Sequence, residues 1–424
     1  MAERDFDVVV FGATGVTGRR VAAYLAERAE QTGARWAAAG RDAAKVERVL
    51  AEVGVSGAQT IVADVGNPAS LQAMAARTRV VLNLVGPYTL YGWPVIEACV
   101  AGGAHYADLT GEIPFVRRVI DAFDARAAAA EVKLVQVCGF ECLPPDLAVL
   151  LAAETARERW GEGLADAELA VSVRQPPGMP RLSDAISGGT LQSLAAVMGA
   201  EDPSVATDPA ALITDPVAAA EVRRVSPISV APRLGPDGAV IAPMAPAAFI
   251  NPAVIQRTAV LLAAGDGRRS APFSYREGMV LAGSSATLPL RYGMAGMLAG
   301  MQAGFAALSR AQPSVRRRLA DVLGNILPGS GFGPAADRLQ NWTWRMSLKA
   351  HTAGGHGLTV EVSAEGHPGY LATARMLGEA GLILAAVDLA PKRSGCLTPA
   401  AALGTGSLER FEHARLRFAV GGGT

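Results

Sequence analysis

Three glycines with a three-residue spacing stand near the start of the chain, in the stretch FGATGVTGRR at residues 11–20. An apolar run precedes them and a segment of helical period follows. At such a junction Gly12 permits a tight turn, Gly15 lets the backbone approach a pyrophosphate, and Gly18 lets helix and strand pack closely. The N-terminus of the following helix then favours an anion. The pattern predicts a dinucleotide site built from Gly12, Ala13, Thr14, Gly15, Val16, Thr17 and Gly18.

The end of the second apolar run indicates which nicotinamide cofactor this site takes. An NAD site has a carboxylate there for the ribose 2′-hydroxyl, whereas an NADP site has an arginine for the 2′-phosphate. In AAAGRDAAK, residues 37–45, Arg41 stands in the turn with a planar guanidinium suited to a phosphate. The turn therefore predicts NADPH. Asp42 leaves two alternatives open, because it could cap the next helix or bind the ribose.

Further polar residues follow the later strands, at the sheet edge where an open α/β fold binds its ligand. Asp64 ends the third strand, and it either accepts from the adenine amine or caps the helix that begins at Pro68. Asn83 and Gly86, in NLVGPYTLYG after the fourth strand, are expected near the nicotinamide. These residues join the glycine-rich loop and Arg41 in the predicted cofactor site.

Tyr88, in the same stretch, is the predicted catalytic residue. A phenol can donate a hydrogen bond to the negative charge that develops as a hydride arrives. The alternative is that Tyr88 packs against the cofactor or the domain seam. A second polar cluster, in HYADLTGE at residues 105–112, either lines the cleft or caps the following helix; its members are His105, Tyr106, Asp108, Thr110 and Glu112.

Strand-length apolar runs alternate with segments of helical period over the first third of the chain. The predicted strands are residues 6–11, 35–39, 60–63, 79–84, 104–109 and 132–138, and helices are expected to begin near residues 17, 43, 68, 92 and 114. This alternation predicts an α/β fold with a Rossmann-type doubly wound parallel sheet. With 424 residues the chain can bury two cores. We expect an NADP-binding domain at 1–150, completed by 367–420, and a substrate or dimerisation domain inserted at 151–366.

The inserted domain shows the alternation typical of strands with one wet face. Apolar and polar side chains alternate at residues 342–351, and after the turn AGGHG the alternation resumes at residues 358–365. This pattern predicts an antiparallel hairpin, with AELAVSV at residues 167–173 as its partner strand. The inserted domain should therefore be α+β with a mainly antiparallel sheet.

Charge and composition argue against several classes of function. Lys plus Arg and Asp plus Glu are equal at 39 each, which favours a small-molecule partner over nucleic acid. Four cysteines and the lack of a targeting peptide indicate a cytoplasmic protein with free thiols. The five histidines lack the spacing of a zincin and the cysteines lack C-x-x-C pairs, so no metal is expected.

A charge-free stretch at residues 292–309, YGMAGMLAGMQAGFAALS, is rich in methionine and small residues. One interpretation is a buried or half-exposed helix. The others are an acyl-chain channel, a homodimer face, or a peripheral membrane or lipid contact. Downstream, three arginines at 316–318 form a solvated face or a docking site for an acidic carrier protein. The glycine-rich loop at 328–334 is a candidate lid.

Several well-separated motifs resemble those of one family. The motifs GATGVTG, AGRDAAK, VGPYTLYG, HYADLTGE, GFECLPPDL, SGGT, GHPGYLATARML and LTPAAALG occur in the order and spacing of the saccharopine dehydrogenase-like oxidoreductases. Within that family the chain looks most like the bacterial trans-acting enoyl reductases. The resemblance implies a Rossmann domain with an inserted domain, and NADPH-linked reduction of a carrier-bound unsaturated acyl chain in lipid or polyketide assembly. Glu141 and Cys142 depart from the family, which usually has Asp and Ser there.

Three functions are open on this basis. The first is an NADPH-dependent enoyl reductase for a carrier-bound or CoA-bound chain, with an acyl carrier protein as a partner. The second is a saccharopine-type C–N oxidoreductase, which needs cations in its pocket for substrate carboxylates; Arg174, Arg181 and Arg257 are the candidates. The third is a non-catalytic lipid-binding or partner-binding protein that retains the nucleotide fold.

Overall fold

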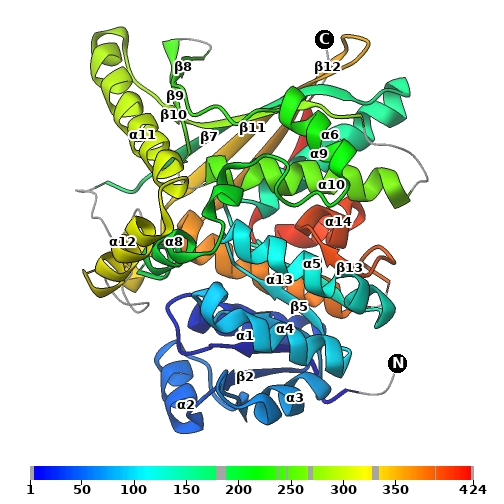
Figure 1. The fold of residues 1–424 in the computed structure, drawn as a ribbon. Coiled ribbons are helices and arrows are strands. Elements are labelled where there is room, and N and C mark those ends of the chain that lie inside the picture. The colour runs from blue at the N-terminus through cyan, green and yellow to red at the C-terminus, as the bar shows by residue number, and fades with distance from the viewer. Residues whose placement is uncertain are drawn as a thin grey trace.

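The chain forms two seven-stranded sheets in a computed structural model, shown in Figure 1. The structure describes residues 4–177, 188–235, 238–244, 247–265, 271–326, 334–386 and 388–421. Arg181 and most of the glycine-rich loop at 328–334 therefore lie outside the described residues.

The first sheet is wholly parallel, with strand order β13-β6-β5-β4-β1-β2-β3. Its strands are β1 Phe6–Phe11, β2 Trp36–Gly40, β3 Gln59–Val62, β4 Thr78–Asn83, β5 His105–Asp108, β6 Lys133–Val135 and β13 Gly395–Leu397. The predicted Rossmann-type sheet is confirmed. Its seventh strand, β13, comes from the C-terminal part of the chain and pairs with β6. The domain boundaries near residues 150 and 366 stay a prediction, and helix α6, Leu143–Trp160, runs across the first of them.

Five helices connect the strands of the first sheet. They are α1 Gly18–Thr32, α2 Ala43–Glu52, α3 Pro68–Ala76, α4 Tyr88–Gly102 and α5 Ile113–Ala129. Four begin within a residue of the predicted position, but α4 begins four residues before Gly92. The reason is Glu112, whose carboxylate accepts the backbone N–H groups of Tyr88 at 2.9 Å and Thr89 at 2.7 Å. A carboxylate from a distant loop thus satisfies the first donors of α4.

The sixth strand is shorter than predicted because the chain turns out of the sheet after Val135. Val137 has a φ of 66°, and its N–H donates to the Asp108 carboxylate at 3.2 Å. The N–H of Cys138 donates to the Asp108 carbonyl oxygen at 2.8 Å. Both donors are satisfied by the end of β5, so the backbone leaves the ladder without unpaired groups.

The second sheet has the strand order β14-β12-β11-β7-β10-β9-β8, and β7 and β10 are its one parallel pair among the described residues. Its strands are β7 Leu164–Arg174, β8 Arg233–Leu234, β9 Val240–Ala242, β10 Ser274–Leu281, β11 Thr343–Thr352, β12 Gly357–Glu365 and β14 Leu416–Gly421. The predicted hairpin is β11 with β12, and residues 167–173 lie in its predicted partner β7. The alternation holds, because every second side chain from Trp342 to Ala350 is buried.

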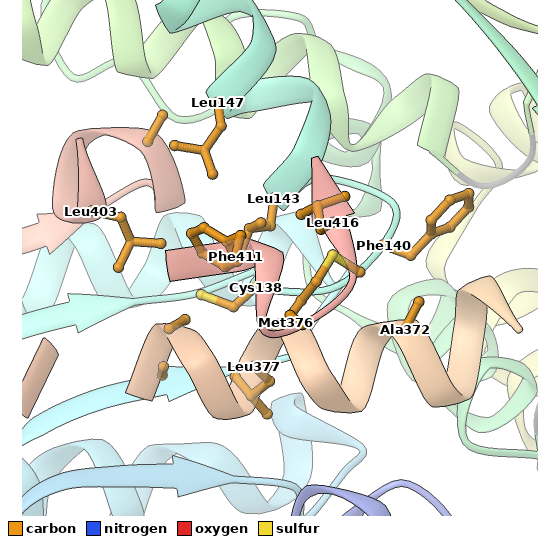
Figure 2. Packing of buried hydrophobic residues seen from close by; sticks show 14 of the residues in the cluster. Cys138, Phe140, Leu143, Leu147, Ala372, Met376, Leu377, Leu403, Phe411 and Leu416 are labelled. Carbon is orange, nitrogen blue, oxygen red and sulfur yellow. The ribbon is translucent and has the colours of Figure 1, made fainter. Parts of the chain in front are cut away.

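Two helices, α6 and α13 Thr373–Ala385, lie between the sheets and share a large apolar core. Figure 2 shows side chains of both helices meeting those of the C-terminal segment; they include Leu143, Leu147, Met376, Leu377, Leu403, Phe411 and Leu416. The remaining α-helices among the described residues are α8 Gly188–Gly199, α9 Pro216–Val225, α10 Asn251–Gly265, α11 Leu288–Ser309, α12 Pro313–Ile326 and the short α14 Pro399–Leu403. The shared core makes the two sheets one packed body.

A buried ionic network joins α13 to α1. The carboxylate of Glu379 accepts from the Tyr24 hydroxyl at 2.6 Å and from the Arg28 guanidinium at 3.2 Å. Arg410, in the short helix η7 Thr405–Glu412, donates to its other oxygen at 2.9 Å. Glu379 is fully buried, so three donors compensate the loss of its hydration.

Candidate active site

The glycine-rich loop between β1 and α1 leaves its backbone open to a ligand. Gly12 has a φ of 90°, and a Cβ there would lie 2.9 Å from Val85 Cγ2. At Gly18 a Cβ would clash with the carbonyl oxygen of Gly12. At Gly15 the nearest atom would be 3.4 Å away, so this glycine keeps its surface for a ligand. Thr17 at the N-cap makes no side-chain cap bond, and the helix N-terminus can take an anion.

The loop lies in a cleft of about 740 Å³. That volume falls within the range of roughly 300–1,000 Å³ usual for ligand and cofactor sites. The glycine-rich loop, the ends of β2 and β4, and residues after β5 and β6 line it. Ser193 of α8, Ile250 before α10, and residues at and just before the start of α13 complete the lining. The carboxyl ends of the parallel strands thus open on the cleft, as the fold requires of a dinucleotide site.

Cations gather at one end of the cleft. Arg41 and Lys45 line it beside the end of β2, and Arg19 lines it from α1. Asp42 is turned to α2, where its carboxylate accepts the Lys45 N–H at 3.0 Å. The structure therefore favours the helix-capping role of Asp42 over a role in binding the ribose. Arg41 and Lys45 remain as the cations that can face a 2′-phosphate. The glycine cradle and this cationic end together fit NADPH.

Three residues of the predicted cofactor set do not line the cleft. Ala13 is fully buried. The Asp64 carboxylate accepts the Gly66 N–H at 2.8 Å. Asp64 does not cap α3, which was its predicted alternative role; the cap is Asn67, whose side chain accepts the Ser70 N–H. Asn83 is also fully buried, and its amide binds the Tyr106 hydroxyl at 3.0 Å and the Val85 N–H at 3.0 Å. Asp64 and Asn83 thus shape the loops around the cleft.

The predicted catalytic Tyr88 lines the cleft but is mostly buried. Its hydroxyl donates to the Asn83 carbonyl oxygen at 3.1 Å and accepts the Leu109 N–H at 3.3 Å. Burial and, to a lesser extent, the nearby Asp108 carboxyl raise the pKa of this phenol well above its usual range. The hydroxyl is already engaged on both sides by backbone, so its geometry suits a residue that holds two loops in place. Tyr91, which also lines the cleft, is 40 % exposed.

The cluster after β5 divides between structural and cleft-lining residues. His105 begins β5, at the opposite end of the strand from the cleft, and its Nδ1 accepts the Lys133 N–H at 3.1 Å. Burial lowers the pKa of His105 to about 4. Asp108 is fully buried and accepts from the Tyr106 hydroxyl at 2.8 Å; burial raises its pKa to about 7. Of the five residues expected to line the cleft or cap the following helix, Thr110 is the one that lines the cleft, and Tyr106, Asp108 and Glu112 are fully buried.

Glu141 is the carboxyl group that reaches the cleft from the sheet edge. It lines the cleft in the turn before α6, and burial raises the pKa of its carboxyl. A Cβ at Gly139 would lie 3.3 Å from Glu141 Oε2, so the glycine lets the side chain fold back over the turn. Asn251 holds the backbone here by donating to the Glu141 carbonyl oxygen at 2.6 Å. Cys142 is fully buried, so the thiol beside Glu141 does not face the cleft.

Sequence reasoning missed several residues on the side facing the inserted segment. They are Ser193 of α8, Ile250 before α10, Gly369 and Tyr370 in the short turn before α13, and Thr373 at the start of α13. Ser193 donates to the Glu112 carboxylate at 2.7 Å, and the Thr373 hydroxyl accepts the Phe140 N–H at 3.1 Å. Gly369, Tyr370 and Thr373 stand in the motif GHPGYLATARML, but this motif does not indicate a cofactor contact, because these residues reach the cleft only through tertiary packing.

The described arginines proposed for a carboxylate-binding pocket lie elsewhere. Arg174 is exposed at the end of β7. Arg257 is buried, and its guanidinium donates to the carbonyl oxygens of Leu212 at 2.6 Å and Cys396 at 2.8 Å. Among the described lining residues, the cations are the three at the nucleotide-phosphate end. The other end thus has no guanidinium from the described chain.

The described residues hold no group of three or more His, Cys, Asp or Glu side chains placed to bind a metal ion. Within the same ranges, each helix is too short or too polar to span a bilayer.

A parallel sheet with a glycine cradle and a cationic phosphate site defines an NADP-dependent oxidoreductase. Residues 8–135 match the family model described as the saccharopine dehydrogenase NADP binding domain. The chain belongs to the saccharopine dehydrogenase-like family, and its cofactor is NADPH.

Relatives resemble it over nearly their full length. A candidate trans-acting enoyl reductase of Mycobacterium tuberculosis is 36 % identical over 423 residues, which cover 96 % of each chain. A trans-acting enoyl reductase of Mycobacterium bovis is 33 % identical over 431 residues, covering 97 % of this chain and 96 % of that one. Among solved structures, apo saccharopine dehydrogenase from Saccharomyces cerevisiae matches with a TM-score of 0.49 and 13 % identity, over 98 % of this chain and all of that one.

Proposed function

We propose that the protein is an NADPH-dependent enoyl reductase that acts in trans on an unsaturated acyl chain bound to a carrier protein or to coenzyme A. The observation that carries this proposal is the uneven charge of the cleft. Its phosphate end holds Arg19, Arg41 and Lys45, whereas the described residues at the other end include Ile250, Tyr91 and a carboxyl group but no cation. A neutral thioester fits such an end better than a substrate with two or three carboxylates. The names of the full-length relatives point to the same reaction.

NADPH, when bound, supplies the hydride that reduces the carbon–carbon double bond. The chain must hold the thioester against the cofactor, exclude water, and return a proton to the α-carbon. Glu141 suits this last role, because it is the carboxyl group that lines the cleft, and burial raises its pKa and so favours the protonated form. The proton passes from its oxygen to the α-carbon of the enolate, and water at the cleft mouth restores it. Tyr88 then acts as a positioning residue through its bonds to Asn83 and Leu109.

Turnover tests the reaction itself. NADPH oxidation should occur with 2-enoyl thioesters, on coenzyme A and on acyl carrier protein, in a series from short to long chains. The same preparation should leave NADPH unchanged with mixtures of an amino acid and a keto acid. Oxidation by the amino acid mixtures instead would favour the C–N oxidoreductase. Tight NADPH binding with neither activity would favour a binding protein.

A labelling experiment separates the two proton donors. In D₂O the wild type should place deuterium on one face of the α-carbon. Glu141→Gln should lower kcat by about 10²–10⁴-fold and lose this selectivity, while it still binds NADPH. Glu141→Asp should retain part of both. Tyr88→Phe should keep the selectivity and mainly lower stability. The reverse pattern would assign the proton to Tyr88.

A further inference from the structure

Helix α11 exposes a stripe of large apolar side chains. Leu290, Met294, Met297 and Met301 are 67, 46, 62 and 66 % exposed. Their spacing of four, three and four residues places them on one face of the helix. With 22 residues, α11 is about 33 Å long at 1.5 Å per residue. Contiguous apolar surface of this kind marks an interaction site more often than scattered exposed side chains do.

The next helix, α12, lies at the same edge of the molecule as α11 (Figure 1). It adds exposed apolar and cationic side chains. Val315 and Val322 are 51 and 49 % exposed. Arg317 and Arg318 are exposed between them. Arg316 is instead buried, where its guanidinium donates to the carbonyl oxygens of Met198 and Ala200. We use the name α11–α12 surface for the exposed side chains of the two helices taken together, which are Leu290, Met294, Met297, Met301, Val315, Arg317, Arg318 and Val322.

Acidic residues are missing from this part of the chain. Between Glu277 and Asp321 the sequence has no Asp or Glu. Glu201, whose carbonyl oxygen accepts from Arg316, is an exposed carboxylate beside α12. The α11–α12 surface therefore combines apolar contact with positive charge, and among the described residues Asp321 and Glu201 are exposed carboxylates beside α12.

We propose that the α11–α12 surface docks on a lipid membrane that carries negative charge. The methionines enter the boundary between headgroups and acyl chains, and the arginines contact lipid phosphates. A second copy fits less well, because two such surfaces would bring arginines together with few carboxylates to pair them. An acidic carrier protein would match the charge of the arginines. It would not account for the apolar stripe, which runs along α11 while the arginines lie on α12. This proposal does not depend on the reaction proposed above.

Vesicle sedimentation with the full chain tests this proposal. The protein should bind vesicles of phosphatidylcholine with phosphatidylglycerol more tightly than vesicles of phosphatidylcholine alone, and salt should weaken the binding. Arg317→Gln with Arg318→Gln should weaken it about fivefold for each arginine. Met297→Ser with Met301→Ser should weaken it by a similar factor for each methionine, because about two thirds of each side chain is free to be buried.

Matched controls use exposed residues elsewhere. Arg345→Gln with Arg417→Gln, and Val217→Ser on α9, should leave vesicle binding unchanged; their side chains are also exposed. NADPH affinity should be the same in all variants, which would show that each is folded. Equal binding of the methionine variant and the wild type would overturn the proposal. A lack of vesicle binding by the wild type would also overturn it. In that case, dissociation of a dimer by the methionine substitutions in sedimentation velocity would indicate a second copy as the occupant, and loss of binding to acyl carrier protein would indicate the carrier.

Discussion

Replacing Arg41 and Lys45 should change the preference for NADPH over NADH without disturbing the rest of the site. Both side chains line the cleft beside the end of β2. Asp42 between them is occupied by the cap of α2, where it accepts the Lys45 N–H at 3.0 Å. Arg41→Ala and Lys45→Ala therefore remove the cations that would face a 2′-phosphate, and leave the carboxylate in place.

The size of the effect follows from charged hydrogen bonds. Each such bond contributes about 1.5–3 kcal/mol, and the exposure of Arg41 favours the lower value. A loss of about 1.5 kcal/mol corresponds to roughly tenfold weaker binding. Each single variant should thus raise the Kd for NADPH about tenfold, and the double variant about 10²-fold if the two cations act independently. The Kd for NADH should stay within about twofold, because NADH has no 2′-phosphate.

Titration of both coenzymes by nicotinamide fluorescence measures these constants. Asp42→Ala is the informative control. As a helix cap it should cost about 1 kcal/mol of stability and leave both Kd values unchanged. Equal weakening of NADPH and NADH by Arg41→Ala would refute the assignment of Arg41 to the 2′-phosphate. A selective loss of NADH affinity in Asp42→Ala would show instead that Asp42 binds the ribose.

Three further predictions concern packing and charge. Gly18→Ala should weaken NADPH binding at least tenfold, because its Cβ would clash with the Gly12 carbonyl oxygen; unchanged affinity by fluorescence titration would contradict this reading. Glu379→Gln should lower the free energy of unfolding by about 3 kcal/mol, since it leaves the buried Arg28 without its counter-charge, and urea denaturation would detect this. Burial raises the pKa of Glu277 to about 7, so the folded state holds this proton while the unfolded state releases it above about pH 4.5. The stability that this proton contributes is present at low pH and is lost as the pH rises to 7. The free energy of unfolding of Glu277→Gln should therefore rise by up to about 3 kcal/mol relative to that of the wild type over that interval. Parallel profiles of stability against pH for the two proteins would contradict this prediction.

Features fixed by local backbone were predictable from the sequence. Gly12 and Gly18 stand where a Cβ would meet backbone or Val85, so their spacing alone indicated the loop. The alternation at residues 342–350 predicted β11 and its buried face, because a strand has a side-chain period of two.

Features that depend on distant partners were not predictable in the same way. The early start of α4 requires Glu112, more than twenty residues away in the chain, to accept its first N–H groups. Ser193 and Thr373 reach the cleft from segments with no cofactor motif of their own. The sequence places Lys45 in the first turn of the helix that Asp42 caps, close to Arg41. It does not show which face of that helix points to the cleft, so the contact of Lys45 with the cleft could not be predicted.

The late position of α13 in the chain sets the order in which the site can form during synthesis. Tyr24 and its partner Glu379 are separated by 355 residues, and Gly369, Tyr370 and Thr373 complete the wall of the cleft. A ribosome must therefore release most of the chain before the glycine loop at its start has a finished pocket. Until then the apolar face of the first sheet that α13 covers stays exposed, and such surfaces are what chaperones bind. We expect nascent chains that end before residue 365 to bind NADPH weakly and to depend on chaperones for solubility.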